Sequence, residues 1–402
     1  MTEFRWAKAS DYQNIIEEAN HAFDTAHYTG DFEKDTGKAS FFPRVLPKLY
    51  QNPRIAPMHV LALEEGKVCG LVGLFELPYV VYGMPLTVRG IGTVSVRPGY
   101  RRKGYMKELM AMAISRAAED QTDYMILGGR RQRYGHWGFE QAGAMPFYEV
   151  DTDNTRHTFG ADADFGYRFR KLLTTDAPAL EKERSLREAA AVHMVYPEQE
   201  EFAILCSMGM VPYLIEKDGQ FFGTFMYDEK EKKVCDLRLI VPGEVGPVVN
   251  DLLKAFSEKV LFFTHFGPDA LEMTEALSAL AESCRIETVA MIKILNYERT
   301  LRAYFSLAAA LHRLPDGELR CAFSNGERLR LFVKDGQAGV EKLSEEALSN
   351  EAEGQILYLS EKEAIRLFFH PHTFLHSFGF MIPAAVRAWF PLPFYENMSD
   401  EI

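Results

Sequence analysis

Apolar and polar residues follow their clearest pattern between residues 93 and 110. Thr93, Val94 and Val96 form a short β-branched run that is typical of a strand. Pro98 and Gly99 end this run, because proline cannot donate to a strand ladder and glycine frees the backbone. From residue 103 to residue 120 the apolar side chains recur at helical spacing. The pattern predicts a strand, a tight turn and an amphipathic helix in direct succession.

The turn carries three adjacent cations, Arg101, Arg102 and Lys103, followed by Gly104. The first N–H groups of a helix lack intrahelical partners and lie at the positive end of the helix dipole, which favours an anion. The cations raise the local potential further, and a glycine allows a ligand to approach the backbone closely. This spacing is not that of a Walker loop or of the G-x-G-x-x-G pattern. The turn therefore predicts a phosphate cradle, with a basic surface turn as the alternative.

Around the cradle, helices and strands are interspersed in an order that predicts a mixed α/β sheet. Strands are expected at residues 4–7, 60–63, 67–82, 86–96, 124–129 and 145–150, with helices before residue 23 and near residues 39–50. A compact turn or short helix is expected at residues 134–139. The polar residues 151–155, all turn formers, then indicate a domain boundary.

Two further units are expected beyond that boundary. The second repeats the order of the first, with a helix near residues 245–260 and a strand near 261–266, but it has no basic turn to hold a phosphate. The third begins near residue 289 and contains a helix, a hairpin and a second helix that Ser360 and Glu363 open as a capping box. The predicted domains are therefore residues 1–150, 151–287 and 288–402.

Composition narrows the function classes. At 47% hydrophobic and 25% charged, the 402-residue chain is ordinarily globular. A net charge of −12 argues against nucleic acid as a partner and suits a cationic substrate such as an amine. Five scattered cysteines without a CxxC pair indicate free thiols in a reducing compartment. Without a signal-peptide pattern or an apolar run of about 18 residues, we expect a cytoplasmic protein with no membrane partner.

The strand and cradle resemble the acetyl-coenzyme A loop of the GNAT N-acetyltransferases, which has Arg/Gln-x-x-Gly-x-Gly/Ala after a V-x-V strand. Arg101-x-x-Gly104-x-Met106 fits except at its last position, where Met replaces Gly or Ala and leaves the backbone amide in place. With the Tyr-Gly-x-x-Gly-Phe segment at 134–139 and the two further units, the whole chain is similar to the Eis family (enhanced intracellular survival acetyltransferases).

The resemblance implies a fold and an activity. The fold would be two tandem GNAT-like domains, the second without a cofactor site, followed by a C-terminal domain like sterol carrier proteins. The activity would be acetyl transfer from acetyl-CoA to small-molecule amines, including aminoglycosides, in a homo-oligomer that is a hexamer. Two alternatives stay open: a lipid- or sterol-binding carrier with an auxiliary GNAT domain, and a protein lysine acetyltransferase.

The resemblance also implies cofactor-binding positions. The backbone of the strand before the cradle would pair with the pantetheine arm, the cradle would surround the pyrophosphate, and the glycine-rich end of the next strand would flank the thioester. These positions are Val94, Ser95, Val96, Arg101, Arg102, Lys103, Gly104, Tyr105, Met106, Lys107, Gly129 and Arg130.

Two catalytic groups are implied by the same resemblance. Tyr134 would be the general acid, since a tyrosine with a pKa near 10 stays protonated at neutral pH; the alternative is an aromatic side chain packed in a turn. The carboxylate of Ile402, the last residue, would be the base. A free α-carboxyl is a weak base unless it is desolvated, and the alternative is a disordered tail.

Carboxylates and histidines complete the candidates. Asp24 and Glu401, with Asp400 beside it, could bind a cationic substrate, although each is as readily a solvated carboxylate. His21, His27 and His136 could act as bases or relays, and a structural role is favoured for His136. We expect no metal site, because the histidines at 370, 372 and 376 lack a cysteine or carboxylate framework.

Overall fold

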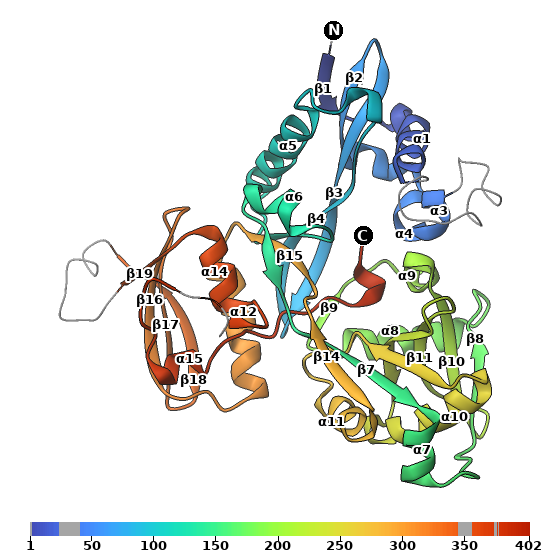
Figure 1. The fold of residues 1–402 in the computed structure, drawn as a ribbon. Coiled ribbons are helices and arrows are strands. Elements are labelled where there is room, and N and C mark those ends of the chain that lie inside the picture. The colour runs from blue at the N-terminus through green and yellow to red at the C-terminus, as the bar shows by residue number, and fades with distance from the viewer. Residues whose placement is uncertain (1, 24–40, 345–355, 374–375, 377) are drawn as a thin grey trace.

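The computed structural model describes residues 2–23, 41–344, 356–373, 376 and 378–402, so that Asp24 and His27 lie outside the described residues. Three sheets form three parts of the molecule, with the C-terminus between the first sheet and the second (Figure 1). The predicted mixed α/β class is confirmed. No helix of the described residues is long and apolar enough to cross a membrane.

The first sheet has eight strands. β3 (Lys67–Val81) and β4 (Met84–Val96) form its long central hairpin. Helix α5 (Tyr105–Glu119) packs against β2, β3 and β4 with Leu109, Met110, Ala113 and Ala117 buried, as the helical spacing predicts. The other face carries α1 (Tyr12–Phe23), α3 (Phe41–Val45) and α4 (Pro47–Tyr50) (Figure 1). The strands run in the order β1 (Thr2–Trp6), β2 (His59–Glu64), β3, β4, β5 (Tyr124–Leu127), β15 (Ala290–Ile294), β6 (Glu140–Ala142), and β9 (Val192–Met194) pairs with β3.

The second sheet has seven strands and its own apolar core. Its helices are α7 (Thr152–Phe159), α8 (Ala177–Glu188), α9 (Glu201–Leu205), α10 (Val245–Phe256) and α11 (Leu271–Leu280). The strand order is β14 (Ser283–Glu287), β7 (Met145–Asp151), β13 (Val260–Thr264), β12 (Lys233–Leu239), β11 (Gln220–Asp228), β10 (Val211–Lys217), β8 (Tyr167–Lys171).

The third sheet has four strands, in the order β18 (Gln337–Lys342), β17 (Arg328–Lys334), β16 (Gly317–Phe323), β19 (Ile356–Leu359). Its helices are α12 (Tyr297–Leu311), α14 (Glu361–Phe368) and the short α15 (Ala384–Arg387). The capping box predicted at Ser360 and Glu363 is confirmed: each side chain accepts from the backbone N–H of the other residue. One apolar cluster joins this sheet to the first, where the Tyr124 and Tyr304 hydroxyls lie 3.1 Å apart.

The sheets exchange strands along the chain. β15, which follows residue 288, is an inner strand of the first sheet, and β7, which ends at Asp151, is an inner strand of the second. The division into residues 1–150, 151–287 and 288–402 therefore stays a prediction about domains. Residues 151–155, interpreted from the sequence as turn formers at a domain boundary, form the N-cap and the first turn of α7. Asp151 accepts the Asn154 N–H at 2.7 Å, and the residues that form turns also form helix N-caps.

A buried hydrogen-bond chain fixes the bend of β4. Thr93 has a left-handed backbone (φ 52°) next to a register shift in the β3–β4 ladder. The fully buried Tyr50 hydroxyl contacts the Thr93 hydroxyl and lies 3.1 Å from His59 Nε2. His59 Nδ1 is 3.0 Å from the Ile55 carbonyl oxygen, so that nitrogen carries the proton and Nε2 accepts from Tyr50. Burial lowers the pKa of His59 to about 4.

His59 makes the free energy of unfolding depend on pH, and the direction of this dependence follows from its lowered pKa. Since its folded-state pKa of about 4 lies below the ordinary 6.5, the unfolded chain binds the proton more tightly between these values. The free energy of unfolding should therefore fall as pH drops from 6.5 to 4. Relative to a His59→Gln variant, wild type should lose roughly 3 kcal/mol over this window in urea titrations. The exposed His157→Gln variant is the control and should follow wild type; a constant difference between wild type and His59→Gln would contradict the prediction.

Candidate active site

The two central strands of the first sheet separate like a fork. β4 and β5 are paired in parallel only where Val88, Arg89 and Gly90 face the first three residues of β5. Beyond this pairing β4 continues to Val96, whereas β5 ends at Leu127. The last residues of β4 therefore pair with β3 on one side and present an open backbone edge on the other. An open strand edge can pair with an extended amide-containing ligand.

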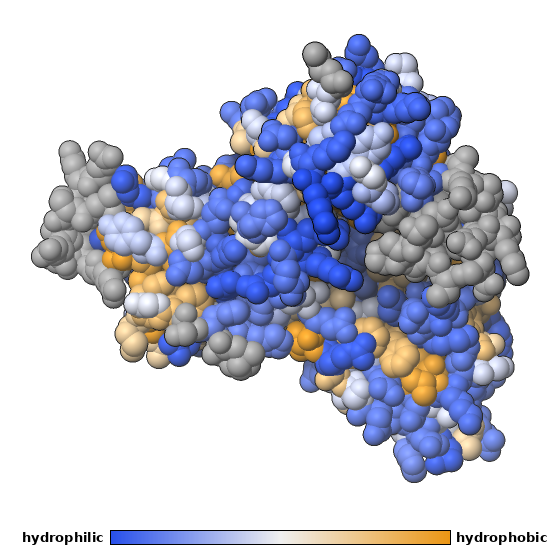
Figure 2. Space-filling model, turned by 45° about the horizontal axis from the view of Figure 1, so that its top comes forward, coloured by the Kyte–Doolittle hydropathy of each residue, from blue (hydrophilic) through white to orange (hydrophobic). Residues whose placement is uncertain are grey.

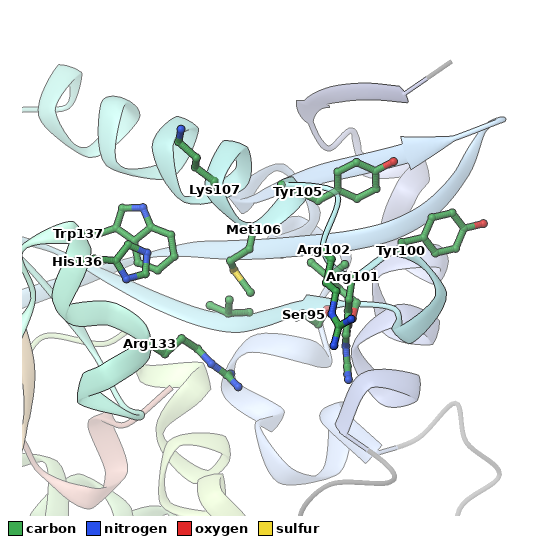
Figure 3. A pocket seen from close by; sticks show the side chains of 13 residues that line it. Ser95, Tyr100, Arg101, Arg102, Tyr105, Met106, Lys107, Arg133, His136 and Trp137 are labelled. Carbon is green, nitrogen blue, oxygen red and sulfur yellow. Dashed lines mark hydrogen bonds between the residues drawn. The ribbon is translucent and has the colours of Figure 1, made fainter.

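A cavity of about 670 Å³ lies along this open edge. It runs from the turn that begins α5 to the short helices α6 (Arg131–Tyr134) and η5 (Gly135–Trp137) (Figure 3). The Ser95 hydroxyl lines it and has no partner among the described residues. The lining is Val94, Ser95, Val96, Tyr100, Arg101, Arg102, Gly104, Tyr105, Met106, Lys107, Arg133, His136 and Trp137.

The turn at the start of α5 exposes a row of backbone donors. Within the described residues, the N–H groups of residues 102–106 have no hydrogen-bond acceptor. Arg102 (φ 68°) and Gly104 (φ 87°) both have left-handed backbones, which turn successive N–H groups inward as in an anion-binding nest. The side chains of Arg101 and Arg102 extend together from the turn, and Arg133 extends from the opposite wall (Figure 3). The arrangement fits a pyrophosphate.

Lys103 does not line this cavity. Its Nζ lies 3.0 Å from Glu64 Oε1, and the Tyr105 hydroxyl contacts the same carboxylate. Hydrogen bonds from Tyr105 and Lys103 lower the pKa of Glu64, which therefore stays ionised and holds the lysine against β2. Of the three cations in the turn, the two arginines face the cavity.

Tyr134 is the last residue of α6, the short helix that follows β5. Its ring packs against Gly129, where a Cβ would come within 2.8 Å of the ring, so the glycine (φ 139°) is needed for this contact. Burial raises the pKa of Tyr134, while the nearby Arg133 guanidinium opposes the rise. The hydroxyl is therefore protonated at neutral pH and can donate a hydrogen bond. Gly129 and Arg130, predicted beside the thioester, are outside the cavity lining.

Ile402, the last residue, lies on β4 at the point where the fork opens. A Cβ at Gly92 would be 3.8 Å from the Ile402 carboxyl carbon, and one at Gly90 would overlap the Ile402 side chain. The two glycines leave the space that the terminal residue occupies. The adjacent Glu401 has its Oε1 3.4 Å from His265 Nε2. Burial alone would lower the pKa of His265, but Cys235 and Glu401 raise it to about 10, so Glu401 faces a cation.

The structure thus brings together residues that are distant in the sequence. Nine of the predicted cofactor positions line the cavity: Val94, Ser95, Val96, Arg101, Arg102, Gly104, Tyr105, Met106 and Lys107. The sequence interpretation missed Tyr100 and Arg133, and it missed Gly90 and Gly92 as the seat of the last residue. Arg133 directly precedes the Tyr-Gly-x-x-Gly-Phe segment, and this position in the sequence could have indicated that it belongs to the site. Within the described residues, no group of three or more histidines, cysteines or carboxylates is arranged to hold a metal ion.

Comparisons with known proteins agree with this geometry. Residues 3–142 match the family model described as acetyltransferase (GNAT) domain. None of the curated proteins matches the chain. Among solved structures, a probable N-acyltransferase from Enterococcus faecalis V583 is 13% identical, with a TM-score of 0.63 over 92% of this chain and 90% of that chain.

Two other solved structures are similar over most of the chain. A GCN5-related N-acetyltransferase from Anabaena variabilis is 16% identical, with a TM-score of 0.59 over 91% of this chain and 90% of that one. Eis1 from Mycobacterium abscessus is 14% identical, with a TM-score of 0.60 over 99% and 98%. At such identities the likeness shows the fold. GNAT domains use acetyl-CoA. The chain therefore carries a GNAT acetyltransferase domain in residues 3–142, and the protein is a transferase.

Proposed function

We propose that the protein is an acetyl-CoA-dependent N-acetyltransferase that acetylates primary amines of small cationic acceptors. One observation carries the proposal: the fork between β4 and β5 has an anion-binding cavity on its open edge, Tyr134 at one prong and the chain's own carboxylate at the other. Tyr134 follows Arg133, which lines the cavity, and Ile402 lies on Gly92, two residues before the lining residue Val94, so we infer that the donor, the acid and the base border one place.

On the donor side, the chain supplies binding and orientation. The open edge at Val94–Val96 would pair with the pantetheine amides as an added strand. The N–H groups of residues 102–106, with Arg101 and Arg102, would bind the pyrophosphate. Met106 contributes its backbone amide here, so the departure from the usual Gly or Ala does not remove a donor. When bound, acetyl-CoA supplies the activated acetyl thioester.

On the acceptor side, residues of the chain would remove a proton from the amine and supply one to the leaving group. An amine attacks only when it is neutral, so its ammonium proton must leave before or during attack. The Ile402 carboxylate would hold the ammonium and accept that proton, and the Tyr134 hydroxyl would donate to the departing thiolate. Burial raises the pKa of Tyr134, which keeps the donor protonated at working pH.

The acceptor is proposed to be polycationic, such as an aminoglycoside or another polyamine. The net charge of −12 favours cations near the protein. Hydrophilic residues border the central hollow on the face shown in Figure 2, as a polar acceptor requires. Asp24 and Glu401 are proposed to add to this acidity. We further propose the Eis-like assignment, cytoplasmic location, a hexamer and a sterol-carrier-like third domain. A lipid carrier ranks lower, because the cavity is lined by cationic side chains and the inner face of the third sheet is packed with its own apolar side chains.

The proposal predicts acetyl transfer to multi-amine acceptors. Wild-type protein with acetyl-CoA and a panel of aminoglycosides, linear polyamines and lysine peptides should release free thiol with the first two classes, because several ammonium groups strengthen binding to an acidic site. Mass spectrometry should show acetylated amines. Absence of turnover with every amine, together with absence of acetyl-CoA binding by calorimetry, would refute the function; turnover with peptides alone would replace the acceptor class.

Tyr134→Phe should separate chemistry from binding. Removing one hydroxyl that donates in the transition state should lower kcat by about 10²–10³-fold, with the KM for acetyl-CoA changed less than about twofold. Tyr148→Phe is the matched control, since Tyr148 is similarly buried but lies on β7 in the second sheet. Its hydroxyl accepts a hydrogen bond from the Ser278 hydroxyl. Equal losses in kcat and in acetyl-CoA affinity for Tyr134→Phe would mean that this tyrosine only shapes the pocket.

Extending the chain should remove the base. Two glycines after Ile402 convert its carboxylate into an amide and push the new terminus away from Gly92. We expect kcat to fall by about 10²-fold or more, while the Kd for acetyl-CoA stays within about twofold. The same two glycines at the N-terminus are the control. Unchanged turnover in the C-terminally extended protein would exclude the carboxylate from the reaction.

A further inference from the structure

The last residues of the chain are buried, although chain ends usually fray. Met398 is 5% exposed, and Ser399 and Asp400 are fully buried. They form a single turn, η11 (Met398–Asp400), which ends two residues before the terminal carboxylate. In Figure 1 this end of the chain enters the space between the first and second sheets. The position of Ile402 therefore depends on what holds this turn.

The turn is held by a second fork. In the second sheet, β12 pairs with β13 in parallel at Lys233, Val234 and Cys235 only, as β4 pairs with β5 over three residues in the first sheet. Asp236 is the first residue beyond this pairing. In the first sheet the equivalent opening borders the cofactor cavity, whereas here η11 contacts β12. The second fork holds the chain's own tail.

We propose that Asp236 is a positioning residue for the acetyl transfer, the centre of a socket that sets where the Ile402 carboxylate lies. The socket consists of Asp236, Arg238, Tyr196 and Lys48. The inference rests on the proposed function for its catalytic consequence, but the docking of the tail can be measured without it.

Asp236 makes the central contacts. It is 2% exposed, and its two carboxylate oxygens accept the Met398 and Ser399 backbone N–H groups, each at 3.0 Å. Backbone N–H groups fix the chain's register independently of side-chain rotamers. Asp236 itself has a left-handed backbone (φ 48°) next to a register shift in the β11–β12 ladder, which aims its side chain at the turn. Hydrogen bonds to a charged acceptor are stronger than neutral ones.

Three further contacts come from β12 itself, from the loop after β9 and from α4. Arg238 Nη2 donates to Asn397 Oδ1 at 2.9 Å, and the Tyr196 hydroxyl donates to Asp400 Oδ1 at 2.9 Å. Lys48 Nζ, on α4 beside the first sheet, donates to the Ser399 carbonyl oxygen at 2.6 Å. The socket therefore ties the tail to both sheets at once.

The socket fixes the register of the tail, that is, which tail residue lies beside Asp236. A slip of one residue would move the terminal carboxylate by about 3.3 Å, the rise of extended chain. A misplacement of about 1 Å can cost a catalysed step on the order of a hundredfold. Gly90 and Gly92 leave space for one terminal residue at one place, so a displaced tail cannot present its carboxylate at the fork.

The test compares Asp236→Asn with a matched variant in the full-length protein. The asparagine keeps the shape but replaces one accepting oxygen by an amide that faces an N–H group. Asp251→Asn is the control, because Asp251 is similarly buried in the second unit and also accepts backbone N–H groups, those of Phe165 and Tyr167, away from the tail. Tyr196→Phe, which removes a single contact to Asp400, serves if Asp236→Asn does not fold.

Docking is measured by digestion with a carboxypeptidase, followed by intact-mass spectrometry. Since the enzyme reaches the tail only when it leaves the socket, Asp236→Asn should lose residues 398–402 about tenfold faster than wild type, and Asp251→Asn should not. Catalysis is the second readout: Asp236→Asn should lower kcat by about tenfold or more with the KM for acetyl-CoA unchanged within about twofold.

The outcomes separately test the socket, the positioning role of Asp236 and the proposed function. Digestion of Asp236→Asn at the wild-type rate overturns the socket, as does an equal kcat loss in Asp251→Asn. Faster digestion with unchanged kcat overturns the positioning role. If wild type transfers no acetyl group to any amine, the proposed function fails, and the digestion rates still decide whether Asp236 holds the tail.

Discussion

The separation of β4 from β5 beyond Gly90 is the constraint on which the site depends. Pairing over three residues holds the strands together at the base, and the left-handed Thr93 bends β4 away above it. Such a bend leaves backbone groups without a ladder partner, which is costly unless another partner is found. The buried Tyr50–His59 pair stabilises the bend from behind, and the open edge faces a cavity in front. The bend of β4 therefore has two effects: it requires the buried contacts of Tyr50 behind the strand, and it opens the strand edge that faces the cavity.

A second consequence concerns how the three sheets are joined. β15 inserts between β5 and β6, so that residues after the second sheet complete the first, and the tail then returns to the same sheet at Gly90. Between these two crossings lies the third sheet, whose core is continuous with that of the first. The third unit is therefore tied to the first sheet through β15, through the shared core and through the terminal residue at Gly90.

The sequence predicted what local patterns determine. The strand, turn and helix at 93–110, the capping box at Ser360 and the order of most elements follow from side-chain spacing over a few residues. It could not predict that Gly90 and Gly92 make room for Ile402, or that Asp236 binds the tail, because these contacts join residues far apart in the chain. Residues 151–155 start a helix where turns were expected, because Asp, Asn and Thr favour turns and helix N-caps alike and only the following residues decide. The sequence also could not predict that the Lys103 side chain pairs with Glu64, because Glu64 lies on another strand, far from residue 103 in the chain.

The charges around the first fork are divided in a way that bears on the reaction. Arg101, Arg102 and Arg133 line the cavity, whereas the chain ends in a run of acidic groups, Asp400, Glu401 and the terminal carboxylate. Asp400 and Glu401 are occupied by Tyr196 and His265, so the carboxylate of Ile402 is the acidic group of this run that the fork itself receives. In the proposed reaction, the anionic donor would bind among the arginines and the cationic acceptor near the terminal carboxylate. At the second fork the buried Asp236 carboxylate accepts two backbone N–H groups of the tail, whereas the first fork has an open edge beside a cavity lined by arginines, and this difference matches the two uses of similar strand arrangements.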